Sequence, residues 1–143
     1  MPLLTKQADK VEVLGDVPLF SELSKKELTA LARISDEVPV REGAELVCEG
    51  KWGHQLAIIL EGNAVVRRNG RKVAESGPGA VVGEIGLVTD RPANATVVVT
   101  EPSVVLVLEP RAFRTVMADM PSVATKILAT VADRLAATDA KAT

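Results

Sequence analysis

Aromatic residues are scarce in this sequence, which has one tryptophan, two phenylalanines and no tyrosine. A core must therefore be built from aliphatic side chains, and 47% of the 143 residues are apolar. That fraction argues against a disordered chain, and the length fits one domain. The shortage of aromatic rings also argues against a stacking surface for single-stranded nucleic acid.

Cysteine and histidine are nearly absent, with Cys48 and His54 as the single examples. One cysteine allows no intrachain disulfide. We interpret Cys48, which lies in an apolar strand-like stretch, as a small buried hydrophobe. One histidine is too few for a metal-dependent jelly-roll enzyme, and nothing places a nucleophile beside it for a Ser–His–Asp triad. We therefore expect no enzyme activity, no metal and no cofactor.

Long runs of one charge sign are also missing, and the net charge is −2. The nearest approach to a basic patch surrounds the hairpin-turn signal Asn69–Gly70, so we predict a solvated hairpin tip there. Its basic residues are Arg67, Arg68, Arg71 and Lys72. No apolar run reaches the 18 residues of a membrane span, and the first ten residues lack the apolar run of a signal peptide. We expect a cytoplasmic chain that alone binds neither DNA nor membrane.

The hydrophobic periodicity changes twice along the chain. Ser24 and Glu27 form an S-x-x-E capping box for a helix that runs to about Ser35. Short β-branched runs separated by glycine and proline then extend to about Leu108, a pattern typical of a sandwich or barrel. The strands that this pattern predicts are Gln55–Leu60, Ala64–Arg68, Val97–Val99 and Val104–Leu108, the last two as central strands buried on both faces.

Helical spacing returns after residue 109. Pro110 suits a first helical position, and a second helix is expected from Pro121 to about Ala137. We predict an α+β fold, mainly β, in which a jelly-roll-like β-roll lies between N-terminal helices and two C-terminal helices. The whole chain, 1–143, would form a single domain. Its parts would be about 1–37 for the N-terminal helical segment, 38–109 for the roll and 110–143 for the C-terminal helices.

One segment, residues 83–97, has the residues of a phosphate site. We expect two strands interrupted by a short helix that starts at Gly83, whose unpaired N–H groups and positive dipole end suit an anion. Gly83 and Gly86 would let a ligand approach the backbone closely, and Glu84 can accept hydrogen bonds from ribose hydroxyls. Taken singly, Glu84 could only complement the helix dipole, and the glycines could be turn residues.

Three segments together resemble the cyclic-nucleotide-binding domain family of catabolite activators, protein kinase A regulatory subunits and cyclic-nucleotide-gated channels. Its phosphate-binding cassette has the pattern G-E-[IL]-[AG]-L, then P-R-[AST]-A-[TS]-V. The matches here are Gly83-Glu84-Ile85-Gly86-Leu87, then Pro92, Ala95, Thr96 and Val97. Residues 17–24 resemble the N-terminal helical entry of the family, and Glu49-Gly50 with residues 58–62 resembles a segment of its roll. The resemblance implies a regulatory domain that binds cAMP or cGMP.

The resemblance also implies roles for single residues. Glu84 would hold the ribose 2′-hydroxyl, and the amides of Ile85 and Gly86 would bind the cyclic phosphate. The family has an arginine after the proline, but this chain has Ala93. Because arginine binds phosphate bidentately, its loss should cost roughly 2–5 kcal/mol, or about tens-fold to a few thousand-fold in affinity. The ligand-binding residues that we predict are Gly83, Glu84, Ile85, Gly86, Leu87, Ala93, Asn94, Ala95 and Thr96.

Several alternatives stay open around this missing arginine. Arg91 could substitute for it, although a solvent-facing turn residue is the more ordinary interpretation. Asn94 and Thr96 could contact the ligand or be simple strand residues. Ala93 could mark a natural member with weak binding or the truncation of an arginine, and the intact surroundings favour the second explanation. A structural or interaction module that binds no nucleotide is the alternative function.

In the family the C-terminal helix moves when ligand binds, because its apolar residues cap the purine. The candidates for the base cap here are Leu128, Val131, Arg134 and Leu135. The same stripe could pack on the roll or join a second subunit in a homodimer. The chain stops at Thr143, where transcription factors of the family continue into a DNA-reading domain, so we expect the output to go to an effector protein or domain. Trp52, in a Gly-flanked loop, could cover the roll or mark a contact surface, and we expect local packing.

Overall fold

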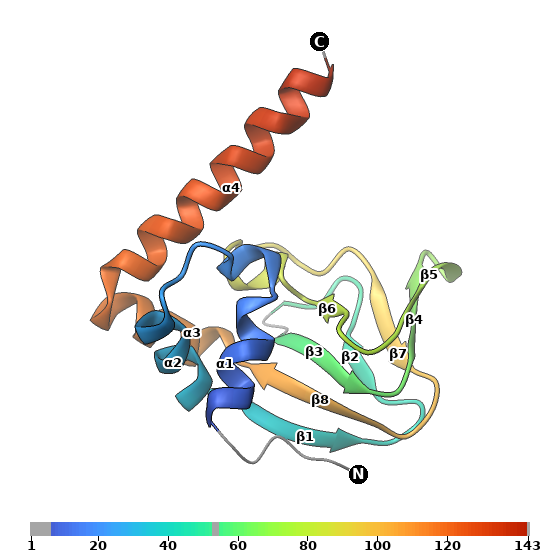
Figure 1. The fold of residues 1–143 in the computed structure, drawn as a ribbon. Coiled ribbons are helices and arrows are strands. Elements are labelled where there is room, and N and C mark those ends of the chain that lie inside the picture. The colour runs from blue at the N-terminus through green and yellow to red at the C-terminus, as the bar shows by residue number, and fades with distance from the viewer. Residues whose placement is uncertain (1–6, 53–54, 143) are drawn as a thin grey trace. The chain divides into compact units, whose positions relative to one another are not determined.

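The computed structural model describes residues 7–52 and 55–142 of the chain (Figure 1). Contacts divide them into two compact units. One unit is Ser35–Phe113, and the other combines the residues up to Ile34 with those from Arg114 onward. We call the first the roll unit and the second the helical unit, and we describe each by itself.

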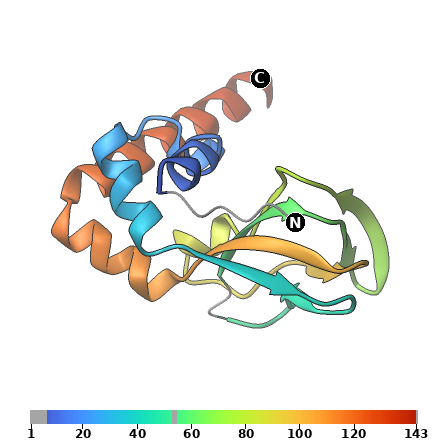
Figure 2. The ribbon, with the colours of Figure 1, turned by 60° about the horizontal axis from the view of Figure 1, so that its bottom comes forward.

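The roll unit consists of two four-stranded antiparallel sheets (Figures 1 and 2). The strand order is β1-β8-β3-β6 in one sheet and β2-β7-β4-β5 in the other. The bounds are β1 Asp36–Val40, β2 Glu45–Val47, β3 Leu56–Glu61, β4 Ala64–Arg68, β5 Arg71–Ser76, β6 Val81–Val82, β7 Thr96–Val99 and β8 Ser103–Leu108. The predicted β-roll is confirmed.

The core of this unit lies between the two sheets and is aliphatic, as the composition predicts. It gathers Ala93 from the loop before β7 and side chains from both sheets: Leu46, Val47, Ala57, Ile59, Ala64, Val82, Val97, Val99, Val105 and Val107. Every residue of β8 is buried, so the prediction of a central strand buried on both faces is confirmed there. For β7 that prediction is wrong, because Thr96 and Val98 on its second face are only half-buried.

Two turns show why glycine is required at specific positions. Asn69 and Gly70 have φ values of 53° and 79°, so the hairpin between β4 and β5 is the predicted turn. Gly62 has φ of +107°, and a Cβ placed on it would lie 1.8 Å from Ser103 Oγ. Ser103 is itself buried and donates its hydroxyl to the Glu101 carbonyl at 2.8 Å. The close approach of these two segments therefore depends on the absence of a side chain at position 62.

The helical unit contains α1 Gln7–Gly15, the 3-10 turn η1 Pro18–Phe20, α2 Lys25–Arg33 and α4 Pro121–Ala142, and α3 Pro110–Asp119 continues into it from the roll unit. The predicted capping box is confirmed, because Glu27 N donates to Ser24 Oγ at 3.2 Å and Ser24 N to Glu27 Oε1 at 2.8 Å. None of the described helices combines the length and apolar composition that a bilayer crossing needs.

The C-terminal helix α4 is longer than expected. We predicted its end at about Ala137, but it continues to Ala142. The extra residues include alanines and a lysine, which have high helix propensity. The Thr138 hydroxyl donates a hydrogen bond to the Arg134 carbonyl, one turn earlier in the helix, at 3.0 Å.

Candidate functional site

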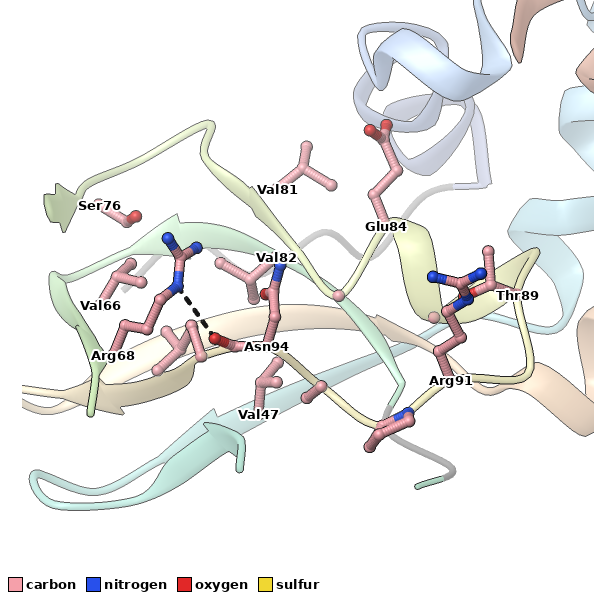
Figure 3. A pocket seen from close by; sticks show the side chains of 16 residues that line it. Val47, Val66, Arg68, Ser76, Val81, Val82, Glu84, Thr89, Arg91 and Asn94 are labelled. Carbon is pink, nitrogen blue, oxygen red and sulfur yellow. Dashed lines mark hydrogen bonds between the residues drawn. The ribbon is translucent and has the colours of Figure 1, made fainter. Parts of the chain in front are cut away.

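The roll unit contains a cavity of about 790 Å³. Most of its lining comes from residues 81–84, 86, 89, 91–95 and 97, which include both halves of the segment singled out in the sequence. The sheet β2-β7-β4-β5, which also contains Val97, contributes four further side chains, from the end of β2, from β4 and from the end of β5: Val47, Val66, Arg68 and Ser76 (Figure 3). The volume lies within the usual range of about 300–1,000 Å³ for small-molecule sites.

The first half of the segment is a tight turn held against β3. The loop before β6 is fixed by Gly79 N, which donates to Ile59 O at 2.7 Å, and β6 then pairs with β3. Gly83 follows with φ of 78°, a conformation that favours glycine. The half-buried Glu84 comes next, on the edge of the cavity.

The expected short helix is one 3-10 turn, η2, from Ile85 to Leu87. Inside it, Gly86 N donates to Gly83 O at 3.1 Å, and Leu87 N donates to Glu84 O at 3.3 Å. A single turn sums few peptide dipoles, so the helix dipole that we expected here is small. The Gly86 amide is also bonded within the turn, which makes side-chain charge more important for the attraction of an anion.

The second half of the segment is fixed by the loop between β2 and β3. Ala93 N donates to Lys51 O at 2.9 Å, and Gly50 N donates to Ala93 O at 2.8 Å. The methyl group of Ala93 belongs to the apolar core cluster, and the residue is 9% exposed. Trp52, in the same loop, is 61% exposed, so our expectation of local packing was wrong. Backbone hydrogen bonds of Gly50 and Lys51 hold this part of the loop without the Trp52 side chain.

Thr96 has a structural partner at the start of β7. Its hydroxyl accepts a hydrogen bond from Glu49 N at 2.9 Å. The Glu49 side chain in turn accepts from Asn69 N, in the β4–β5 turn, at 3.0 Å. Glu49 therefore connects the start of β7 to the turn between β4 and β5, a role that the sequence pattern did not indicate.

Arg68 is the site residue that the sequence analysis missed. Its Nε donates to Asn94 O at 3.1 Å, which holds its side chain over the second half of the cassette (Figure 3). The sequence predicts a solvated hairpin tip for this residue, and the side chain is indeed exposed, but it also lines the cavity. The alternation of side-chain directions along β4 could have indicated this position. Val66 and Arg68 share one face of the strand, and both line the cavity.

The other predicted site residues fall into three groups. Six of them line the cavity: Gly83, Glu84, Gly86, Ala93, Asn94 and Ala95. Leu87 is buried, and the side chain of Ile85 lies outside the described part of the structure. The candidates for the base cap belong to the helical unit, where Leu128, Val131 and Leu135 are 68%, 38% and 62% exposed. Arg91 lines the cavity, and like Arg68 it is an exposed side chain.

Nothing in the described residues points to redox or metal chemistry. Cys48 is half-buried, and burial together with the nearby Glu45 raises the pKa of its thiol, so the unreactive neutral form is favoured. Among residues 7–52 and 55–142, no three His, Cys, Asp or Glu side chains gather as a metal site would require. His54 lies outside the described residues.

Comparison with known proteins agrees with this geometry. Residues 37–120, more than half of the chain, match the family described as "Cyclic nucleotide-binding domain". The chain belongs to the cyclic nucleotide-binding domain family, as its cassette predicts.

Relatives come from kinase regulation and from transcription. A cAMP-dependent protein kinase regulatory subunit from Yarrowia lipolytica is 31% identical over 101 residues, which are 71% of this chain and 27% of the subunit. The chain thus spans about a quarter of that curated relative. The N-terminal domain of a transcriptional regulator from Streptomyces coelicolor A3(2) has 30% identity, a TM-score of 0.79 and coverage of 90% of this chain and 93% of its own.

A third relative is a regulatory subunit of a cAMP-independent protein kinase A from Trypanosoma cruzi, solved bound to guanosine. It has 27% identity and a TM-score of 0.71, over 82% of this chain and 43% of its own.

Proposed function

We propose that this chain is a regulatory domain that binds a cyclic nucleotide, cAMP or cGMP, in the cavity of the roll unit. The observation behind this proposal is that one cavity of about 790 Å³ gathers Gly83, Glu84 and Gly86 from one half of the cassette and Ala93, Asn94 and Ala95 from the other. The relative from Yarrowia lipolytica is named for its dependence on cAMP, which supports this ligand class.

The chemistry of the lining suits such a ligand. Glu84 supplies carboxylate acceptors for ribose hydroxyls, and Arg68 and Arg91 supply positive charge for a phosphate. Apolar contact for the base comes from Val47, Val66 and Val81. Without an arginine at position 93, we expect weaker binding than a cassette arginine would give.

We propose that binding shifts the C-terminal helix between two positions and so passes the signal to an effector protein or domain. Leu128, Val131 and Leu135 form an apolar stripe at helical spacing on α4, and all three are exposed. An exposed stripe of this kind gains free energy when it is covered, whether by the ligand base or by a second subunit. A ligand that contacts the stripe in only one helix position would shift the population toward that position.

Calorimetric titration of the whole chain with cAMP and with cGMP tests this proposal. We expect saturable heat, with a dissociation constant in the micromolar to millimolar range because the cassette arginine is missing. Circular dichroism of the same sample shows that the protein is folded. A folded chain that gives no heat at millimolar ligand, with or without the substitution Ala93→Arg, would overturn the proposal and favour a structural or interaction module.

A nucleoside without phosphate is a second candidate ligand. Ala93 favours it, since the alanine offers no charge to a phosphate, and the Trypanosoma cruzi relative was solved with guanosine. Adenosine and guanosine in the same titrations discriminate between the two ligands. If the nucleosides bind as tightly as the cyclic nucleotides, the phosphate contributes nothing and the nucleoside is the ligand.

A further inference from the structure

We propose that Arg68, on strand β4, binds the phosphate of the ligand and supplies from outside the cassette the positive charge that Ala93 does not. This inference rests on the proposed function, since it assumes that a cyclic nucleotide enters the cavity of the roll unit. It assigns a residue of another strand to the site and predicts where the anionic end of the ligand lies.

The position of the guanidinium is the first argument. Arg68 Nε donates to the carbonyl of Asn94 at 3.1 Å. Asn94 directly follows Ala93, and both residues line the cavity. The Arg68 side chain therefore ends beside the part of the cassette in which the missing charge would lie (Figure 3).

The hydrogen-bonding capacity of Arg68 is the second argument. A guanidinium has five N–H donors in a planar fork, and the bond to Asn94 uses only the one on Nε. The two Nη groups form the other edge of the fork, a geometry that matches two oxygens of one phosphate. The bond to Asn94 also restrains the side chain, so less rotamer entropy is lost when a ligand binds.

Charge complementarity is the third argument. The negative charge of a cyclic nucleotide is on its phosphate, whereas the ribose and the purine are neutral. The charged side chains of the lining are Arg68, Glu84 and Arg91. Glu84 would repel the phosphate and suits the ribose, so the phosphate should lie beside an arginine.

Arg91 is the competing cation, and the structure favours Arg68 over it. Arg91 rises from the loop directly before Pro92, whereas Arg68 is the last residue of a strand paired on both sides. Figure 3 shows the two arginines on different parts of the lining, Arg68 on β4 and Arg91 on the loop before Pro92. Substituting each arginine singly tests this choice.

Arg67 provides a matched control. It precedes Arg68 in β4, has the same side chain and is also exposed, but its side chain leaves the opposite face of the strand and does not line the cavity. Arg67→Ala therefore removes one positive charge from the same strand without touching the proposed contact. Any general effect of net charge should appear equally in both variants.

The experiment is calorimetric titration of the wild type and of R68A, R67A and R91A with cAMP, cGMP, adenosine and guanosine. We expect R68A to weaken cyclic nucleotide binding by about ten-fold to several hundred-fold. R67A should stay within about three-fold of the wild type, and R91A, whose side chain also lines the cavity, should lose clearly less affinity than R68A. The affinity for nucleosides should be the same in R68A as in the wild type, because they lack the phosphate.

Two further variants guard against a purely structural effect of the lost bond to Asn94. R68K keeps the charge without the planar fork, and we expect its affinity to lie between those of R68A and the wild type. The double variant R68A/A93R returns an arginine to the cassette and should regain the binding that R68A loses. Thermal melting of each variant identifies any loss of affinity that comes from unfolding.

The outcomes separate the two proposals. Wild-type protein that is folded but binds none of the four ligands overturns both. Wild-type protein that binds cyclic nucleotides while R68A binds them equally well overturns the role of Arg68 alone. A loss in R91A in place of R68A, or an equal loss for nucleosides, also contradicts it.

Discussion

Buried Glu27 of helix α2 forms an ion pair with the partly exposed Lys126 of helix α4, with 2.6 Å between Lys126 Nζ and Glu27 Oε1. The same carboxylate accepts hydrogen bonds from the Ser122 hydroxyl and from Ser24 N. Glu27 is only 3% exposed, so its charge depends on these partners. Lys126 above all, then Ser122 and the Ser24 amide, lower the pKa of Glu27 from 4.5 to about 2.

This pKa predicts an acid-sensitive attachment of α4 to α2. The pKa is lower in the folded state, so Glu27 stabilises the fold above its unfolded pKa of about 4.5, and the stabilisation is lost as the pH falls toward about 2. Glu27→Gln should therefore lower the free energy of unfolding at pH 7 by about 1–3 kcal/mol. Its deficit relative to the wild type should shrink between pH 4.5 and pH 2. Urea denaturation along a pH series measures both effects.

The matched control for Glu27 is Glu22→Gln, because Glu22 is an exposed glutamate in the same helical unit. We expect a change within about 0.5 kcal/mol at every pH. A deficit in the Glu27 variant that stays constant down to pH 2 would mean that it reflects packing and not the carboxylate charge.

Because Gly62 lies so close to Ser103, we expect a side chain at position 62 to lower the stability of the fold strongly. In Gly62→Ala, the new Cβ would lie 1.8 Å from Ser103 Oγ and 2.9 Å from its Cα, so the backbone itself must move. Gly43→Ala is the control, because Gly43 has φ of +88° but its new Cβ would meet no atom within 4 Å. We expect the control to cost about 1–2 kcal/mol from backbone strain alone. Gly62→Ala should cost about 1–3 kcal/mol more in chemical denaturation.

Much of the fold follows from local pattern. The capping box at Ser24, the turn at Asn69–Gly70 and the helix start at Pro110 each depend on residues a few positions apart, and the structure has all three. Strand β4 has the predicted bounds because Gly62 and Gly70 lie in the turns on either side of it. The cassette could be predicted because its residues match a family pattern at fixed spacing, and the structure brings six of them to one cavity.

The features that were missed depend on contacts between distant segments. The bond from Arg68 to Asn94 spans 26 residues, and those from Glu49 to Thr96 and to Asn69 span 47 and 20. Charge near a turn predicts solvent exposure, and only the pairing of β4 with β7 brings Arg68 to the cassette. The exposure of Trp52 was missed for the same reason, since the backbone bonds to Ala93 that hold its loop come from a distant part of the chain.

Returning the arginine to the cassette should strengthen binding. Ala93 is held by its amide and carbonyl to Lys51 and Gly50, so Ala93→Arg keeps the backbone in place and adds a side chain that has to extend into the cavity. We expect cAMP or cGMP to bind about ten-fold to a thousand-fold more tightly in calorimetry. The melting temperature should fall, because a charged side chain leaves the apolar cluster where the methyl group was packed.

Ala95→Arg tests whether this gain depends on position. Ala95 also is buried and lines the same cavity, two residues further along the chain. An arginine there adds the same charge at a position that the family pattern does not use. Equal gains from both substitutions would mean that general attraction of the anion explains the effect.

Glu84 should bind the ribose, and a chemical modification of the ligand can test this. The side chain is half-buried at the cavity edge, where a carboxylate can accept a hydrogen bond from a 2′-hydroxyl. We expect Glu84→Gln to weaken binding of cAMP by about ten-fold to a hundred-fold, since a hydrogen bond to a charged acceptor contributes about 1.5–3 kcal/mol. In the wild type, 2′-deoxy-cAMP should lose a similar factor.

The combination of both changes is the decisive measurement for Glu84. If the carboxylate contacts the 2′-hydroxyl, removing that hydroxyl should cost little more once Glu84 is already Gln, so the two losses are not additive. Losses that multiply fully would place Glu84 away from the ribose. A third result, in which Glu84→Gln raises the affinity for both ligands, would place the carboxylate beside the phosphate, because a negative charge near an anion weakens its binding.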